Sequence, residues 1–314
     1  MQFFDQNTVQ KFLPYPLLID AIATGLQDPI ESPARSHYEP NHDDSTVLIM
    51  PAWKQQNLMG VKLVSIWPGN AAIGQSAVSA VYVLISCATG NPVAVVDGTE
   101  LTLRRTAATA ALGARILSRK NSRTLAVLGT GALSVPMVQA HLSAIPFART
   151  LVWGRTPAKV QEVVERLALL GITAEASIDL QNTLAQADVV AVATMATEPF
   201  IRNVWIKPGT HIGLVGAFTA KMSEAEPALI ARAQVFADNR EAVLEKGGEV
   251  LHAIQQGLIA PSDIIAELAQ LSLKPDHGWR ADDHAVTVFK SVGFASLDLI
   301  AAELVFNANA MNDK

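Results

Sequence analysis

A short apolar run that ends in two glycines is the feature of this chain that points most directly to chemistry. Residues 124–128 are followed by Gly129, Thr130, Gly131, Ala132 and Leu133. When a strand turns into a helix through such a loop, a pyrophosphate can approach bare backbone N–H groups at the positive end of the helix dipole. Ser134 stands where the usual fingerprint has a third glycine, so the motif depends on its flanking strand and helix for specificity. We predict that these five residues bind a dinucleotide.

The end of the next predicted strand indicates which dinucleotide is used. A cofactor without a 2′-phosphate usually meets an Asp or Glu there. Here the residues are Arg155 and Thr156, with Lys159 one helical turn later and no carboxylate. A guanidinium can donate two parallel, charge-assisted hydrogen bonds to a phosphate. We therefore predict that the protein uses NADPH in preference to NADH. The alternative is that Arg155 is a solvated turn residue.

Two further strand ends belong to the same predicted site. Thr194 and Met195 end the third core strand, and Ala217 and Phe218 end the following one. In an open parallel sheet, ligands bind outside the carboxyl ends of the strands. We predict that these four residues surround the nicotinamide. Ordinary packing at a strand end explains their side chains equally well.

Two cations lie on faces that are otherwise apolar. In the predicted strand 58–67, Lys62 lies on the same face as Gly60, Val64 and other aliphatic residues. On the predicted helix, Arg105 lies on the same face as Leu101 and Leu112. A buried cation costs several kcal/mol, on the order of the desolvation penalty of an ion, unless it is paired. The pattern therefore predicts a nearby carboxylate, either from a ligand or from the protein.

Within the protein, Asp97 or Glu100 would be the partner of these cations, and snorkelling of the long side chains is a further alternative. Arg35 shows no such face and by its surroundings is a surface residue.

The elements that must position these residues change in kind along the chain. Strands are predicted at 46–51, 59–67, 77–86 and 92–97, followed by an alanine-rich helix at 100–118. From residue 124 strands alternate with helices, which predicts a parallel sheet. Strands are expected at 124–129, 150–154, 188–194, 211–216 and 235–238.

A long helix at 286–307 is predicted to close the chain. The fold class is therefore α/β, a Rossmann-type doubly wound parallel sheet domain plus a split α+β domain. We predict a dinucleotide-binding domain at 121–293 and a substrate-binding and dimerisation domain made of 1–120 and 294–314.

Composition restricts the class of protein. Half of the 314 residues are hydrophobic and 17% are charged, which excludes a disordered chain, and a net charge of −5 gives no footprint for nucleic acid or anionic membranes. There is no basic leader and no apolar run of membrane-spanning length, so a cytoplasmic protein is expected. The histidines lack metal-ligand spacing, and no metal is expected. The single cysteine, Cys87, is expected to be reduced and buried in an apolar run.

Taken together, several motifs resemble the ornithine cyclodeaminase/μ-crystallin family. They are Gly60-Val61-Lys62, the turn at 68–70, residues 101–108, the Gly129-x-Gly131 loop, and residues 287–293. The resemblance covers nearly the whole chain and implies a homodimer with a split substrate domain. It also implies that Arg35, Lys62 and Arg105 bind a substrate carboxylate, and that Thr106 and Ser291 contact the cofactor.

The same resemblance implies NADPH-dependent reduction of small cyclic 2-imino acids, Δ1-pyrroline-2-carboxylate or Δ1-piperideine-2-carboxylate, to L-proline or L-pipecolate. Lys62 is the expected proton donor, and Thr219 with a water is the alternative. For the function as a whole, the alternative among enzymes is an NAD-dependent ornithine cyclodeaminase or alanine dehydrogenase. It is disfavoured because those enzymes carry an aspartate just after the fifth core strand, whereas this chain has no acid there before Glu224. The other alternative function is that of a non-catalytic NADPH-dependent small-molecule-binding protein of μ-crystallin type.

Overall fold

A computed structural model describes residues 1–41 and 45–312 of the chain. The chain forms two compact units, Met1–Arg105 with Phe294–Lys314, and Thr106–Gly293. The first division falls within helix α3 (Gly98–Leu117) and therefore precedes the boundary placed at 120/121 from the sequence. The substrate and cofactor roles assigned to the two units stay predictions.

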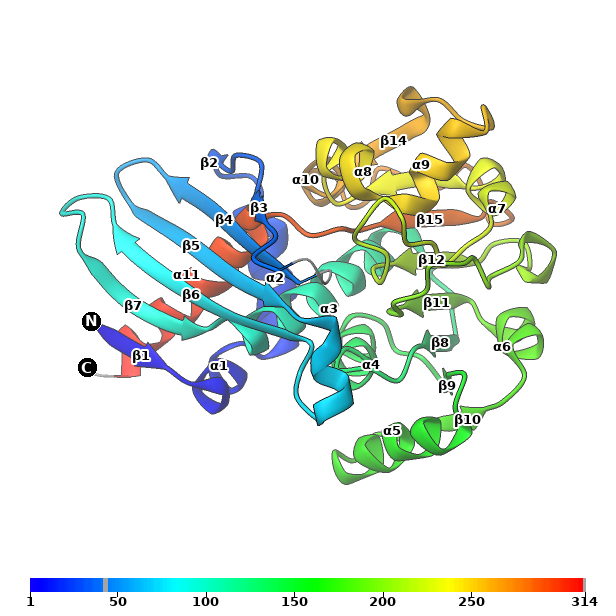
Figure 1. The fold of residues 1–314 in the computed structure, drawn as a ribbon. Helices are drawn as coiled ribbons and strands as arrows, with labels where there is room; N and C mark the ends of the chain where they lie inside the picture. The colour runs from blue at the N-terminus through cyan, green and yellow to red at the C-terminus, as the bar shows by residue number, and fades with distance from the viewer. Residues whose placement is uncertain (42–44, 313–314) are drawn as a thin grey trace. The chain divides into compact units, whose positions relative to one another are not determined.

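The first unit is built on a mixed sheet, which has seven strands among the described residues (Figure 1). Its strand order is β1-β7-β6-β5-β4-β2, with β3 paired to β4, and every pairing except β1 with β7 is antiparallel. The strands are β1 (Gln2–Phe4), β2 (Ile30–Glu31), β3 (Ser36–Tyr38), β4 (Thr46–Lys54), β5 (Leu58–Ile66), β6 (Val78–Ser86) and β7 (Pro92–Asp97). The helices are α1 (Gln6–Phe12), α2 (Tyr15–Gly25), the 3-10 turn η1 (Pro68–Ile73), and α11 (Ala295–Asn312), besides the start of α3.

Helix α11 covers one face of this sheet. It packs against β4, β5, α1 and α2, and buries an almost continuous apolar surface that includes Leu297, Leu299 and Val305. Side chains alternate across a strand, so every second residue of β5 faces this helix: Gly60, Lys62 and Val64 are buried whereas Leu63 is exposed. The sheet thus places Lys62 beneath the last helix.

The second unit is a doubly wound parallel sheet, as predicted. Eight strands are paired in the described part of the chain, in the order β10-β9-β8-β11-β12-β15-β13-β14, all parallel. They are β8 (Thr124–Leu128), β9 (Arg149–Trp153), β10 (Glu175–Ser177), β11 (Val189–Val192), β12 (His211–Leu214), β13 (Gln234–Ala237), β14 (Ile264–Glu267) and β15 (Thr287–Lys290).

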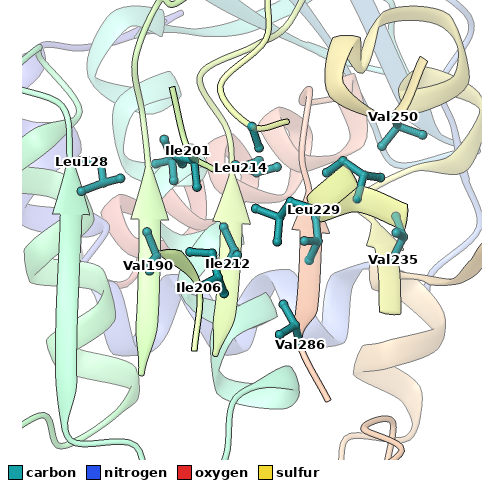
Figure 2. Packing of buried hydrophobic residues seen from close by; sticks show 14 of the residues in the cluster. Leu128, Val190, Ile201, Ile206, Ile212, Leu214, Leu229, Val235, Val250 and Val286 are labelled. Carbon is teal, nitrogen blue, oxygen red and sulfur yellow. The ribbon is translucent and has the colours of Figure 1, made fainter. Parts of the chain in front are cut away.

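The crossovers between these strands are mostly helical. The helices are α4 (Ser134–Ala144), α5 (Pro157–Leu169), α6 (Leu180–Gln186), α7 (Pro227–Arg232), α8 (Arg240–Lys246), α9 (Gly248–Gln255) and α10 (Leu268–Leu273), with 3-10 turns η2 (Asn203–Trp205) and η3 (Pro261–Asp263). Figure 2 shows Leu128, Val190 and Ile212 on neighbouring strands and Leu229 among the buried side chains that pack on one face of the sheet. This core fixes the carboxyl ends of the strands.

Two sequence predictions are wrong in detail. The sequence predicts one helix over residues 286–307, but Thr287–Lys290 form strand β15 between β12 and β13, and the helix begins at Ala295. A short apolar run with β-branched residues fits a buried strand as well as a helix, and periodicity cannot separate the two. Cys87 is exposed, because β6 ends at Ser86 and the thiol lies in the turn that follows.

No helix in residues 1–41 and 45–312 is long and apolar enough to cross a bilayer.

Candidate functional site

A buried carboxylate joins the two cations that the sequence singled out in the first unit. Lys62 Nζ lies 2.8 Å from a carboxylate oxygen of Asp298 on α11 and 3.3 Å from Thr102 Oγ1. The Nε of Arg105 donates to Asp298 Oδ1 at 2.8 Å. The side chains of Lys62 and Asp298 are fully buried, and that of Arg105 is 8% exposed. The two cations therefore share one carboxylate.

The predicted alternative of an internal ion pair is thus correct in kind and wrong in its partners. Asp97 caps α3 by accepting a hydrogen bond from the backbone N–H of Glu100, and Glu100 pairs with Arg104. The partner that sequence reasoning missed, Asp298, stands as an isolated acid between Leu297 and Leu299 in an apolar helix. That isolation is the signal that points to it, because an unpaired carboxylate on a core-facing stripe is as costly as an unpaired cation.

One carboxylate against two cations leaves an excess positive charge. The Nε of Arg105 is engaged, while no hydrogen bond or ion pair of the described residues involves its two terminal nitrogens. A guanidinium in this state offers a parallel pair of N–H donors to a second carboxylate. The group can therefore bind an organic anion without breaking its internal contacts.

The pKa of Lys62 lies close to neutral pH. Burial lowers the pKa of Lys62 to about 8; Asp298 opposes this shift, and the charges of Arg105 and Arg35 add to it. Arg35, which lies between β2 and β3 and is half-buried, is thus near enough to act on the ammonium. An ammonium with a pKa near the working pH suits proton transfer.

Tyr82 completes this group and was not anticipated. It pairs across the strands with Lys62 and is fully buried, and its hydroxyl has no hydrogen-bond partner in the described part of the chain. Burial raises the pKa of Tyr82 well above its ordinary value, and the charge of Asp298 adds to this. A Cβ at Gly60 would lie 1.9 Å from the hydroxyl oxygen. Glycine at position 60 therefore makes the space that Tyr82 occupies.

In the second unit the geometry around the two glycines fits a dinucleotide. Strand β8 lies between β9 and β11, so the strand order reverses at its carboxyl end. Gly129 has φ 128° and its Cβ would lie 2.5 Å from Ala193 O, whereas a Cβ at Gly131 would meet nothing within 4 Å. Helix α4 begins at Ser134 without a side-chain cap from Leu133. An open approach to an uncapped helix N-terminus is what a pyrophosphate needs.

Ser134, in place of a third glycine, helps to close this loop. Its hydroxyl donates to Gly131 O at 2.7 Å and its side chain is buried. Neighbouring Gly154, after β9, would place a Cβ 2.6 Å from Thr130 Cγ2. The loops that follow β8 and β9 therefore touch.

The residues predicted to select the cofactor lie just beyond that contact. Arg155, Thr156 and Lys159 are all exposed. Thr156 precedes α5 without using its hydroxyl as a cap. Their part in binding a 2′-phosphate stays a prediction.

The predicted nicotinamide residues lie at the ends of adjacent strands. Met195 is 60% exposed, Ala217 is buried and Phe218 is half-buried. Thr194 and Ala217 both bond to Glu224. These residues lie in the segments that follow the neighbouring parallel strands β11 and β12, which brings them together at one edge of the sheet.

The other predicted residues differ in their surroundings. Thr219 is exposed, Thr106 is buried, and Ser291 is buried and donates to Asp238 Oδ2 at 2.7 Å. Their predicted contacts with substrate or cofactor stay predictions. No group of three His, Cys, Asp or Glu side chains in the described residues is placed to share a metal ion.

Comparison with known proteins gives a consistent picture. Residues 6–313 match the model of the ornithine cyclodeaminase/mu-crystallin family. The chain is 37% identical over 314 residues to Protein SAR DEFICIENT 4 of Arabidopsis thaliana, covering 96% of each. It is 36% identical over 261 residues to the Delta(1)-pyrroline-2-carboxylate reductase of Paracoccus denitrificans, covering 83% of this chain and 82% of that protein.

Solved structures agree over the full length. The Thermococcus litoralis Delta(1)-pyrroline-2-carboxylate reductase in complex with NADH and L-proline superposes with a TM-score of 0.94 at 26% identity, covering 100% of this chain and 98% of that one. The iminosuccinate reductase of Paracoccus denitrificans in complex with NAD+ gives 0.90 at 26% identity, covering 100% and 97%.

Proposed function

We propose that this chain, which belongs to the ornithine cyclodeaminase/mu-crystallin family, reduces small cyclic 2-imino acids with NADPH. The substrates are Δ1-pyrroline-2-carboxylate and Δ1-piperideine-2-carboxylate, and the products are L-proline and L-pipecolate. The observation that carries the proposal is the buried group in which Lys62 and Arg105 share Asp298 and keep an excess positive charge. The similarity to reductases named for Δ1-pyrroline-2-carboxylate supports it.

The substrate carboxylate is assigned to Arg105 and Arg35. The Nε of Arg105 donates to Asp298, so its two terminal nitrogens can donate to the substrate carboxylate. Because Asp298 neutralises only one of the two cations, the second charge is balanced when the substrate binds. Holding the ring in one orientation supplies part of the catalysis, since a C=N bond that receives a proton accepts a hydride readily once it is positioned.

Lys62 is assigned the proton transfer. Reduction adds a hydride to C2 and a proton to the ring nitrogen, and a nicotinamide supplies the hydride when it is bound. The ammonium of Lys62 donates the proton to the nitrogen as the C=N π-bond breaks, and the neutral amine then regains a proton from water. A pKa of about 8 makes Lys62 a better acid than an ordinary lysine while leaving it mostly protonated at neutral pH.

Oxidative chemistry on amino acids fits less well. The first acid after β12 is Glu224, and both of its carboxylate oxygens accept backbone N–H groups. It is fully buried and bound in this way, so it has no oxygen to offer a water or a substrate amine. This favours reduction over cyclodeamination.

A substrate panel tests the proposal. NADPH oxidation followed at its absorbance band should require an imine with its carboxylate on the C=N carbon. The isomer with the carboxylate on the saturated ring carbon next to the nitrogen should be a poor substrate. Release of ammonia from ornithine with catalytic NAD and no net NADH would instead support the cyclodeaminase alternative, and formation of NADH from alanine with NAD would support the alanine dehydrogenase alternative. NADPH binding without turnover of any imine would support a binding protein.

Arg155 tests the choice of cofactor. The loop after β9 holds no carboxylate for a ribose hydroxyl, whereas exposed Arg155 can pair with a 2′-phosphate. Arg155→Ala should raise the KM for NADPH by about tenfold, the loss expected of one charge-assisted hydrogen bond. The KM for NADH should change little. Steady-state kinetics with each cofactor measures both.

Arg166→Ala is the matched control for Arg155→Ala. Arg166 is an exposed arginine near the C-terminal end of α5, whereas Arg155 lies in the turn before the N-terminus of that helix. Its loss changes the net charge equally and should leave both KM values unchanged. The preference for NADPH should also weaken with added salt, because exposed charges are screened. Equal use of NADH by the parent protein would overturn the assignment.

The homodimer implied by the family is also part of the proposal. The face of the first sheet opposite α11 exposes Leu63 and partly exposes Val61 and Val83. Apolar side chains gathered on an uncovered face are typical of an interface. Light scattering on the eluting protein measures the mass directly, and a monomer would contradict it.

A further inference from the structure

Glu224 has surroundings that the proposed chemistry does not explain. It is fully buried, yet its carboxylate meets the carboxyl ends of two adjacent strands. Oε1 accepts hydrogen bonds from the backbone N–H of Thr194 at 2.7 Å and from its hydroxyl at 2.8 Å. Oε2 accepts from the backbone N–H groups of Gly216 at 3.1 Å and Ala217 at 3.3 Å. One side chain thus ties together the segments that follow β11 and β12.

The surrounding chain leaves space for this carboxylate. A Cβ at Gly216 would lie 2.2 Å from Glu224 Oε1 and 2.1 Å from Thr194 O. A Cβ at Gly248, at the start of α9, would lie 1.8 Å from Met222 O. The backbone approaches so closely at both points that only glycine fits.

A second buried acid supports Glu224 from behind. Glu249 Oε1 accepts the backbone N–H of Glu224 at 3.0 Å, and its other oxygen lies 2.9 Å from Lys290 Nζ. The side chains of Glu249 and Lys290 are both fully buried. Among the described residues, the charges that act on Glu224 are therefore Glu249 on α9 and Lys290 on β15.

This geometry gives Glu224 a role at the cofactor site rather than in the chemistry. We propose that Glu224 is a positioning residue that fixes the ends of β11 and β12 as the binding surface for the nicotinamide half of the cofactor. The inference rests on the proposed use of a nicotinamide cofactor. Glu224 acts through Thr194, Gly216 and Ala217, whose backbone it holds.

The protonation of Glu224 supplies a readout that simple packing would not. Burial raises the pKa of Glu224 to about 7, and the neighbouring charge of Glu249 adds to this. The carboxylate can accept from all four donors, but a protonated carboxyl has one oxygen turned into a donor. As the pH falls through about 7, protonation of one oxygen therefore weakens the contacts that this oxygen accepts at the strand ends.

Binding measurements on the intact protein test the proposal. Titration calorimetry would compare NADPH with 2′,5′-ADP, which has the adenine half and the 2′-phosphate but no nicotinamide. Glu224→Gln keeps the shape but turns an NH2 group toward backbone donors. It should raise the Kd for NADPH by about tenfold, the loss of a strong hydrogen bond, and change that of 2′,5′-ADP by less than about twofold.

Relative to 2′,5′-ADP, the parent protein should bind NADPH more weakly as the pH falls from about 8 to about 6, with release of up to one further proton on binding, and Glu224→Gln should lose this difference. Glu226→Gln is the matched control: Glu226 lies two positions along and also accepts a backbone N–H, from Asn203 at 2.9 Å. It should change neither Kd. Thr194→Val removes the hydroxyl, which donates to Glu224 and accepts the backbone N–H of Ala196 at 3.3 Å, but keeps the backbone bond to Glu224. It should give a smaller loss of NADPH affinity, which keeps the test open if Glu224→Gln does not fold.

Two results would overturn the inference. Equal losses of affinity for NADPH and 2′,5′-ADP would show that Glu224 merely stabilises the domain, and an unchanged Kd for NADPH would show that it does not act on the site. Neither measurement uses an imino acid. A protein that binds NADPH as expected but reduces no imine would therefore defeat the proposed function and leave this inference intact.

Discussion

Replacing Lys62 with methionine should lower kcat for imine reduction by about 100- to 10,000-fold, the usual contribution of a positioned general acid. Methionine keeps the length and apolar stem of lysine but has no proton to give. The variant should fold, because it leaves Asp298 and Arg105 as a balanced one-to-one pair. Affinity for NADPH should be unchanged, since Lys62 belongs to the first unit and the Gly129 loop to the second.

The pH dependence of the parent provides the matching signature. Reduction needs the protonated amine, so kcat/KM should fall about tenfold per pH unit above the Lys62 pKa of about 8. Oxidation of proline needs the neutral amine and should show the opposite dependence below that pH. Both profiles follow from steady-state rates measured across the range.

Thr219 is the competing proton donor and serves as the control. Its side chain is exposed, whereas Lys62 is buried beside Asp298 and Arg105. Thr219→Ala should leave the pH profile unchanged and lower the rate by a small factor at most. A Lys62→Met variant with near-normal kcat, together with a large loss in Thr219→Ala, would reverse the two roles.

Replacing Arg105 with alanine should lower kcat/KM for the imino acid by about 10- to 150-fold, corresponding to about 1.5–3 kcal/mol for hydrogen bonds to a charged group. The loss should appear largely in KM, because the guanidinium binds the substrate carboxylate in the ground state as well as in the transition state. The kcat/KM of Arg105→Lys should lie between those of the parent and Arg105→Ala, since lysine keeps the charge but cannot donate two parallel hydrogen bonds from a planar group.

Arg104 is the matched control for Arg105, one position earlier on the same helix. It pairs with Glu100, donates to Leu13 O and lies over the ring of Tyr15, so its contacts are internal to the protein. Arg104→Lys should affect stability more than KM. If Arg105→Ala folds and keeps its full kcat/KM, then Arg105 serves only to pair Asp298.

The parts of this account that could be predicted depend on local pattern. The parallel sheet follows from strand–helix alternation, and the buried position of Lys62 follows from period-two alternation within one strand. Asp298 could not be paired with Lys62 in this way, because the two residues lie 236 positions apart and meet only when α11 returns to the first unit. The strand Thr287–Lys290 was missed because four residues carry too little periodicity to separate strand from helix.

Glu224 shows a different limit of sequence reasoning. It stands eight positions after Gly216, beyond the place just after the strand where cyclodeaminases carry an aspartate. The chain folds back there and brings the carboxylate to Gly216 and to Thr194, 30 positions away. Side-chain to backbone bonds across such a loop have no sequence signature, so only the structure shows that the acid is occupied.

In the reaction that we propose, a hydride from the nicotinamide is transferred to C2 of a cyclic 2-imino acid. The most direct test is to incubate the protein with Δ1-pyrroline-2-carboxylate and NADPH carrying deuterium at the transferable C4 position, and to analyse the product by chiral chromatography and mass spectrometry. We expect L-proline with one deuterium, at C2, in an amount equal to that of the cofactor oxidised. Cofactor that remains reduced, or proline that forms without deuterium, would contradict it.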